Sequence, residues 1–68
     1  MNRIQKMIVK KMAVGYTQAE VFEYLKEREI LPNSVSMIEK ELKKLRKEFG
    51  AHNIVHLFVI LSKKGYLY

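Results

Sequence analysis

The sequence predicts an all-α fold in which four short helices form a single domain over residues 1–68. Apolar residues recur at the spacing of amphipathic helices, and no segment shows the sustained alternation of apolar and polar residues that is typical of half-buried strands. Gly15, Pro32, Gly50 and Gly65 punctuate the chain between and after these segments. A chain of 68 residues without cysteine has one small core and no disulfide, so we expect a partner subunit to stabilise it.

The first helix is predicted over residues 2–14. Its apolar stripe consists of Ile4, Met7, Ile8 and Met12. The basic residues Arg3, Lys6 and Lys10 lie opposite this stripe. Gly15 is suited to the left-handed conformation that ends a helix.

The second helix is predicted to start at Thr17, because Thr17 and Glu20 have the spacing of a capping box. The residues that face inward are then Val21 and Leu25, with Phe22 or Tyr24 packed beside them. The end of this helix is open: it stops near Leu25 or continues through residues 26–29. Pro32 disfavours helical conformation at the residue before it.

The third helix is predicted over residues 34–49, with Asn33 or Ser34 as its N-cap and Gly50 as the residue that stops it. Its apolar residues form one narrow stripe, which consists of Ile38, Leu42, Leu45 and Phe49. The opposite side carries Ser36, Lys40, Lys43 and Lys47, with Lys44 close to them. The acidic residues lie toward the flanks, so the outermost strip of this helix is basic.

The charge pattern favours a polyanionic partner. Thirteen lysine and arginine residues against seven aspartate and glutamate residues give a net charge of +6. Basic residues dominate residues 1–19 and 35–48, whereas residues 20–34 are acidic. Nucleic acid is the commonest polyanion in a cytoplasm. The alternative is a lysine-rich face of the third helix that is merely solvated.

The fourth helix is predicted over residues 54–64, with Asn53 as its N-cap and Gly65 after its end. It is apolar on nearly every side, and a helix of this kind has to be buried on every side. We therefore expect a two-fold dimer whose interface contains Ile54, Leu57, Phe58 and Leu61. The alternative is that residues 66–68 fold back and cover this helix.

Three segments of the chain resemble the helix-turn-helix domain of the LuxR/NarL/GerE type. Residues 14–21, Val-Gly-Tyr-Thr-Gln-Ala-Glu-Val, resemble the start of the second helix of that domain. The stripe Ile38, Leu42 and Leu45 and the segment 49–53 resemble its recognition helix and the sequence that ends it. Residues 63–67, Lys-Lys-Gly-Tyr-Leu, resemble its closing sequence. The resemblance covers about residues 4–67 and depends on the ordered set of motifs.

The resemblance implies a four-helix helix-turn-helix domain that dimerises through its last helix and places its third helix in the major groove of DNA. The positions that it implies in the groove are Ser36, Glu39, Lys40 and Lys43, with Lys44 and Lys47 nearer the DNA backbone. It also implies a phosphate contact at Thr17 and Gln18, where the N–H groups at the start of a helix favour an anion.

The chain departs from the pattern of that family at three places. Residues 26–33 are longer than the usual tight turn, so they lengthen the second helix or bulge from the turn. Met37 replaces the usual threonine, which removes one phosphate contact. Glu41 replaces a frequent histidine and Glu39 a frequent basic residue; a carboxylate repels phosphate, although glutamate can accept a hydrogen bond from cytosine N4.

No combination of residues indicates an enzyme, a cofactor site or a metal site. The sequence has no nucleophile with a matching base and acid, and no glycine-rich phosphate loop. His52 and His56 have the spacing of two metal ligands on a helix, but no third ligand is placed to join them, so we expect a capping or interface role. The longest apolar run, residues 57–61, is too short to span a bilayer, and the N-terminus has no signal-peptide pattern, so we expect a cytoplasmic protein without a membrane partner.

Together these patterns predict a transcription regulator that binds double-stranded DNA in a sequence-specific manner, as a homodimer on an inverted-repeat site. The alternative is a protein-interaction module that pairs through its last helix with a related, larger regulator and does not read DNA itself. If Met1 is the true start, regulation comes from expression level, dimerisation or a partner protein. If the chain is a piece of a longer protein, a sensor domain can lie upstream.

Overall fold

The computed structural model describes residues 1–31 and 33–67; Pro32 and Tyr68, and the roles predicted for them, lie outside the described residues. The described residues form four α-helices: α1 (Arg3–Ala13), α2 (Gln18–Glu27), α3 (Val35–Glu48) and α4 (Ile54–Lys63). The prediction of a small all-α domain with four helices is confirmed. Helices α1, α3 and α4 fall within their predicted ranges, and α2 ends between the two alternatives that the sequence left open.

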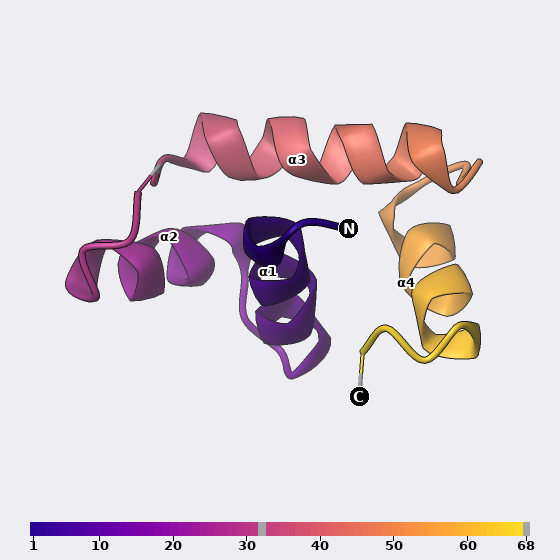
Figure 1. Cartoon of the computed structure of the whole chain (residues 1–68), viewed down its shortest axis with the longest axis horizontal. Helices are drawn as coiled ribbons and strands as arrows, with labels where there is room; N and C mark the ends of the chain where they lie inside the picture. Colours follow the sequence, from indigo (N-terminus) through magenta and orange to yellow (C-terminus); the bar gives the residue numbers. More distant parts are fainter. Residues whose placement is uncertain (32, 68) are drawn as a thin grey trace.

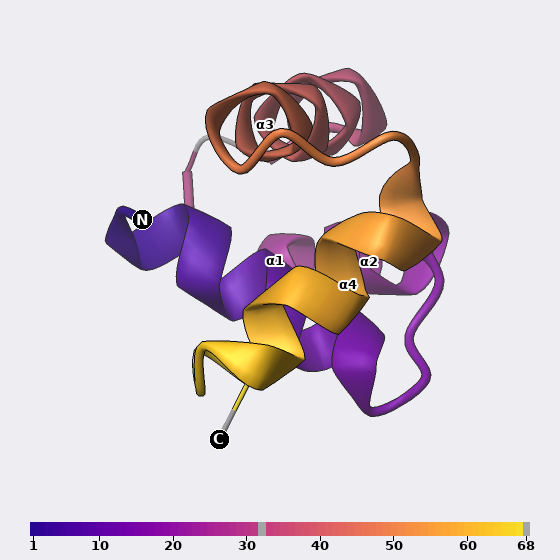
Figure 2. The same ribbon diagram turned by 90° about the vertical axis from the view of Figure 1, so that its right-hand side faces the viewer.

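Helix α3 lies along one side of the molecule, and the other three helices lie together on the opposite side of the core (Figure 1, Figure 2). In Figure 1, α1 lies below the N-terminal half of α3, α2 lies lower and beyond the N-terminal end of α3, and α4 lies below its C-terminal end. Figure 2 views α3 nearly along its axis and shows it apart from the group formed by α1, α2 and α4. Because α3 contacts each of the other helices, one of its sides is packed and the opposite side faces outward.

A polar side chain caps the start of each of these helices by accepting a hydrogen bond from a backbone N–H three residues further on. The capping residues are Asn2, Thr17, Ser34 and Asn53. The capping box of Thr17 with Glu20 is confirmed, and α3 begins after Ser34, one of the two caps that the sequence offered. Helix α1 has a second capping box, between Asn2 and Gln5, which we did not predict. These caps satisfy backbone N–H groups that have no partner within the helix.

Each helix is followed by a residue with positive φ that turns the chain away from the helix axis. Three of these residues are Gly15, Gly50 and Gly65, with φ of 109°, 66° and 76°. The fourth is Glu29, with φ of 53°. After α2 the N–H of Ile30 donates to the C=O of Leu25 at 2.9 Å, and the N–H of Glu29 to that of Lys26 at 3.1 Å, which is the Schellman pattern. Glycine adopts this conformation freely and glutamate does not, so no residue of the sequence signals this helix end.

The connection between α2 and α3 is partly packed against the domain. Ile30 packs against the core, and its C=O accepts a hydrogen bond from Nδ2 of Asn33 at 3.0 Å. Leu31 is exposed. The extra residues between the second and third helices therefore lengthen α2, to Glu27, and continue as a turn at residues 28–30, from which Ile30 packs against the core.

The core draws fully or nearly fully buried apolar side chains from all four helices. Its members are Ile8, Val9, Val21, Leu25, Ile38, Leu42, Leu45, Leu57 and Leu61. The inward orientation of Val21 and Leu25 is confirmed. In α1, Ile8 of the predicted stripe is buried, and Ile4, Met7 and Met12 are partly buried and pack against the core. Val9 and Gln5, which the stripe omitted, are buried as well, and the side chain of Gln5 bonds to Glu41 in α3.

Candidate nucleic-acid interface

The basic side chains of α3 occupy its outward side. We call this group the basic face; it consists of Lys40, Lys43, Lys44, Arg46 and Lys47. Its orientation is fixed from behind, because Ile38, Leu42 and Leu45 are buried in the core and determine the rotation of α3 about its axis. The four lysines are exposed, as their spacing predicts, and Arg46 is half-buried.

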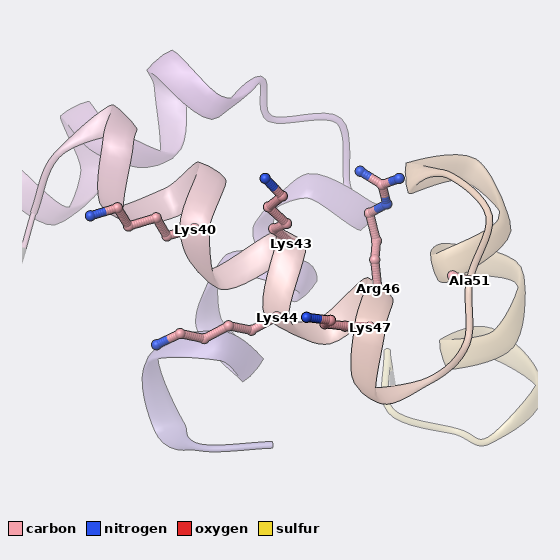
Figure 3. A pocket seen from close by; sticks show the side chains of 6 residues that line it. All are labelled: Lys40, Lys43, Lys44, Arg46, Lys47 and Ala51. Atoms are coloured by element: carbon pink, nitrogen blue, oxygen red, sulfur yellow. The ribbon is translucent and has the colours of Figure 1, made fainter.

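The basic face surrounds a shallow hollow of about 480 Å³ (Figure 3). The hollow is lined by its five cationic side chains and by Ala51, from the connection that follows α3. Figure 3 shows the lysine side chains extending away from the axis of α3, while the guanidinium of Arg46 lies toward the start of α4. Positive charge of this density on one helix attracts a polyanion and is reinforced by the low-dielectric protein behind it.

Arg46 joins the basic face to the connection between α3 and α4. Its Nη2 donates a hydrogen bond to the C=O of His52 at 3.2 Å, and its Nε is buried without a hydrogen-bond partner among the described residues. Arg46 was not among the residues predicted to contact DNA, because it lies beside the outermost stripe of the helix. Its spacing of three residues from Lys43, which makes the two side chains neighbours on the helix surface, is the signal that identifies it.

One acidic side chain, that of Glu41, is fixed at the flank of the basic face. Nε2 of Gln5 in α1 donates to Oε2 of Glu41 at 2.8 Å, and Oε1 of Glu41 lies 3.6 Å from Nζ of Lys44. Gln5 is buried, and its Oε1 accepts a hydrogen bond from the N–H of Asn2 at 3.0 Å. This hydrogen bond could not be predicted from the sequence, because Gln5 and Glu41 are 36 residues apart.

The other residues predicted to contact DNA lie outside the lining of the hollow. Ser36 and Glu39 are exposed on α3. Thr17 and Gln18 lie at the start of α2, where the N–H of Thr17 donates to Oε1 of Glu20 at 2.9 Å. A phosphate at this helix start therefore meets the carboxylate of Glu20, which already satisfies one of the N–H groups and repels an anion.

A hollow lined by residues of α1 and α2 also contains basic side chains, but there they are mixed with acids and aromatic rings. Nζ of Lys11 and the guanidinium of Arg28 each lie 4.1 Å from the ring centroid of Tyr24, within the range of cation–π attraction. Glu23 and Glu27 line the same hollow. This hollow therefore has no field of one sign comparable to that of the basic face.

Helix α4 carries an apolar surface on its outward side. We call it the apolar face; it consists of Ile54, Val55, Phe58 and Val59. Together with Met12, Ser62 and Lys63, these residues line an open hollow of about 610 Å³. The side chains of Val55 and Val59 are 70% and 46% exposed, so this surface is apolar and uncovered in the single chain.

Half of the predicted dimer interface is wrong. Leu57 and Leu61 are completely buried in the core, so neither has any surface to offer a second chain. The other two predicted residues lie on the apolar face, next to Val55 and Val59, which we did not predict. The error has a physical reason: α4 is apolar on nearly every side, so its pattern does not reveal which side faces the core.

Residues 64–67, which follow α4, do not cover the apolar face. The ring of Tyr66 contacts that of Phe49, with 5.8 Å between centroids and an angle of 65° between planes. Leu67 packs against the core. Since Val55 remains exposed, the alternative in which the C-terminal residues shield α4 does not hold for residues 66 and 67.

The two histidines form a local contact at the start of α4. The N–H of His52 donates to Nδ1 of His56 at 3.0 Å, and the rings are stacked with centroids 5.3 Å apart. Within residues 1–31 and 33–67, no three histidine, aspartate or glutamate side chains are grouped so that they could hold a metal ion. None of the helices in this part of the chain is long and apolar enough to cross a membrane.

Comparisons with protein-family models, with curated proteins and with solved structures gave no match to this chain. Any function proposed for the protein has to explain two features of its structure, the basic face of α3 and the uncovered apolar face of α4.

Proposed function

We propose that this protein is a transcription regulator that binds double-stranded DNA in a sequence-specific manner, as a homodimer, with α3 in the major groove. The observation that carries this proposal is the hollow on the outward side of α3, lined by four lysines and one arginine. Double-stranded DNA carries one negative charge for about every 1.7 Å of its axis. Its major groove, about 12 Å wide, accepts one α-helix.

The position of α3 in the fold supports this docking. The helix has 14 residues and lies on the opposite side of the core from α1, α2 and α4, so it can approach a groove without obstruction from them (Figure 2). In the proposed complex Lys40 and Lys43 reach base edges, where lysine donates to O6 or N7 of guanine. Arg46 and Lys47, at the C-terminal end of α3, neutralise phosphates.

The resemblance to LuxR/NarL/GerE-type domains supports the same arrangement, with α2 and α3 as the helix-turn-helix motif. The connection from Arg28 to Ser34 is longer than the tight turn of that family. Because this connection sets where α3 begins, we expect the angle of α3 in the groove to differ from the arrangement that the resemblance implies.

The apolar face of α4 provides the contact for the second copy. A two-fold axis beside α4 brings Val55 and Val59 of one copy against the same residues of the other and removes their exposed surface from water. Two α3 helices related by this axis read an inverted repeat, with half-sites about one helical turn, roughly 34 Å, apart.

Selection of binding sites from random duplexes tests the proposal directly. The expected result is an enriched inverted repeat. On that site the double variant Lys40→Ala/Lys43→Ala should bind at least about tenfold more weakly in a gel-shift assay, because each lost base contact costs about 1–3 kcal/mol.

The matched control for this experiment is Lys6→Ala/Lys10→Ala. It removes the same charge from exposed positions of α1, which lies on the opposite side of the core from α3 (Figure 2). Equal losses for both double variants indicate attraction by net charge alone. If the selection enriches no sequence and Lys40→Ala/Lys43→Ala binds as the unmodified chain does, α3 is not the DNA-reading helix.

The exposed apolar face also supports a second candidate function, that of an interaction module for a related regulator. In this case α4 pairs with the last helix of the partner, and the partner loses its own DNA-binding dimer. Tight pairing between unlike chains, together with weak, salt-sensitive and sequence-independent DNA binding, distinguishes this function from the first.

A further inference from the structure

We infer that Glu41 is a built-in counter-ion of the basic face: Gln5 holds its carboxylate beside Lys44 and so keeps this lysine from neutralising a DNA phosphate. The inference rests on the proposed DNA-binding function and adds a residue that limits sequence-independent affinity. In this role Glu41 affects the ratio of the affinity for the correct site to the affinity for any other duplex. Gln5 is a positioning residue, because it acts through Glu41.

Glu41 differs from the other acids of α3 in being held at both oxygens. Oε2 accepts the hydrogen bond from Nε2 of Gln5 at 2.8 Å, and Oε1 lies 3.6 Å from Nζ of Lys44. The side chain of Glu41 is only 16% exposed, against 69% for that of Lys44. Glu39 and Glu48 are exposed and make no comparable contact within the described residues.

The burial of Gln5 keeps the carboxylate in place. If Glu41 turned away, Nε2 of the buried Gln5 amide would lose its partner, and a buried donor without a partner is costly. An ordinary exposed ion pair is weak, because both side chains lose their freedom when it forms. Here Gln5 has already immobilised Glu41, so pairing restricts Lys44 alone.

The consequence for DNA binding is a reduced number of phosphate contacts. Lys44 must leave Glu41 to reach a phosphate, and the fixed carboxylate then stays close to the DNA backbone. Each phosphate contact contributes about 0.9 to the slope of log affinity against log salt. The base contacts proposed for Lys40 and Lys43 do not involve Glu41, so the penalty falls mainly on sequence-independent binding.

The test uses Glu41→Gln, which retains an oxygen acceptor for Gln5 and removes the charge. Its control is Glu39→Gln, which makes the same change of net charge on the same helix. Affinity for a duplex that lacks the selected site is measured between 50 and 200 mM salt. We expect a slope steeper by about 0.9 for Glu41→Gln than for Glu39→Gln, which amounts to an additional change in affinity of about 3.5-fold over this range.

A double-mutant cycle with Lys44→Ala shows whether Glu41 acts through Lys44. We expect Lys44→Ala to change the salt slope little in the unmodified chain and to reduce it by about 0.9 in the Glu41→Gln background. If Glu41→Gln matches Glu39→Gln, or if Lys44→Ala has the same effect in both backgrounds, the counter-ion role is wrong and the proposed function stands.

A heparin column separates this failure from failure of the proposed function. If the unmodified chain binds no duplex at 50 mM salt, the proposed function is wrong, and elution from heparin then tests the counter-ion with another polyanion. Elution of Glu41→Gln at higher salt than Glu39→Gln supports the counter-ion; elution at the same salt overturns it.

The positioning role of Gln5 has its own test in Gln5→Met, which has a similar volume and no amide. Circular dichroism establishes that the variant is folded. Release of Glu41 should shift the salt slope in the same direction as Glu41→Gln, a change that a loss of stability alone does not produce. An unchanged slope in the folded variant overturns the role of Gln5.

Discussion

Helices α3 and α4 have similar inner sides and very different outer sides. Both bury leucine in the same core, for example Leu45 in α3 and Leu61 in α4. The outer side of α3 carries lysines, whose charged ends remain solvated in the single chain. The outer side of α4 carries Val55 and Val59, which leave apolar surface in water.

This difference places the surface available to a partner on the half of each helix that the core does not use. Contact between a hydrated ammonium group and a phosphate is favourable in free energy, because counter-ions are released. Burial of the same group in an apolar contact is unfavourable. A branched aliphatic side chain gains only by being covered. The two surfaces therefore fit different partners, and substitutions can change one without the other.

The largest effect is expected for Leu61→Ala. This side chain is fully buried, and its truncation leaves a cavity that costs about 2–5 kcal/mol. A domain of this size has little stability to lose, so we expect the midpoint of urea unfolding to fall sharply, or the chain to be unfolded. Val59→Ala, two residues away on the outer side, is the control and should cost less than about 0.5 kcal/mol. A larger loss for Val59→Ala would reverse the assignment of inner and outer sides of α4.

The next effect concerns the apolar face and its proposed second copy. Val59→Asp places a charge on an exposed site, so the monomer should remain folded while the dimer weakens by at least tenfold, or about 1.4 kcal/mol. Analytical ultracentrifugation measures the dimer, and circular dichroism checks the fold. Lys43→Asp serves as the control because it changes the basic face and should leave the dimer intact. Unchanged association of Val59→Asp would place the contact outside the apolar face.

Arg46 lies where the two regions meet and should affect both stability and DNA binding. Arg46→Ala removes the hydrogen bond to the C=O of His52 and the contacts of the side-chain stem, at a cost of about 1 kcal/mol in the free energy of unfolding. It also removes one cation from the basic face. Lys47→Ala removes only a cation, so it should lower the salt slope and leave urea unfolding unchanged. If both variants unfold at the same urea concentration, the contact with His52 does not stabilise the connection between α3 and α4.

The difference between α3 and α4 also explains how much of the structure could be predicted from the sequence. In α3 the apolar residues occupy a narrow stripe, so the pattern alone gave both the buried side and the exposed lysines. In α4 the apolar residues surround the helix, and the pattern could not distinguish the buried Leu57 from the partly exposed Phe58. Helix starts were predictable because caps are local, as the box of Thr17 with Glu20 shows.

Contacts between distant residues account for most of what the sequence did not reveal. The bond from Gln5 to Glu41 joins two helices, and no local pattern distinguishes this glutamine from an exposed one. The hydrogen bond from Arg46 to the C=O of His52 depends on the path of the connection after α3. The charge of the basic face was therefore predictable from the sequence. The two contacts that restrain the side chains of Glu41 and Arg46 were not.

The smallest effect is expected at the end of α2, which belongs to neither face. Glu29 has a φ of 53°, in the left-handed region that favours glycine, whereas the other helices end at glycine. Glu29→Gly should therefore stabilise the domain by about 0.5–1 kcal/mol, measured as a higher urea midpoint. Glu29→Ala is the control, since it removes the same charge and keeps the side-chain carbon that opposes this conformation.

The outcome of Glu29→Gly bears on both surfaces, because Glu29 ends α2 and is followed by the connection that leads to α3. If relief of backbone strain is its only effect, the urea midpoint rises while the salt slope of DNA binding and the dimer affinity stay constant. A change in DNA affinity without a change in the dimer would mean that this turn sets the orientation of α3. Equal stabilisation by Glu29→Ala would instead attribute the effect to the charge, since alanine does not relieve the left-handed conformation.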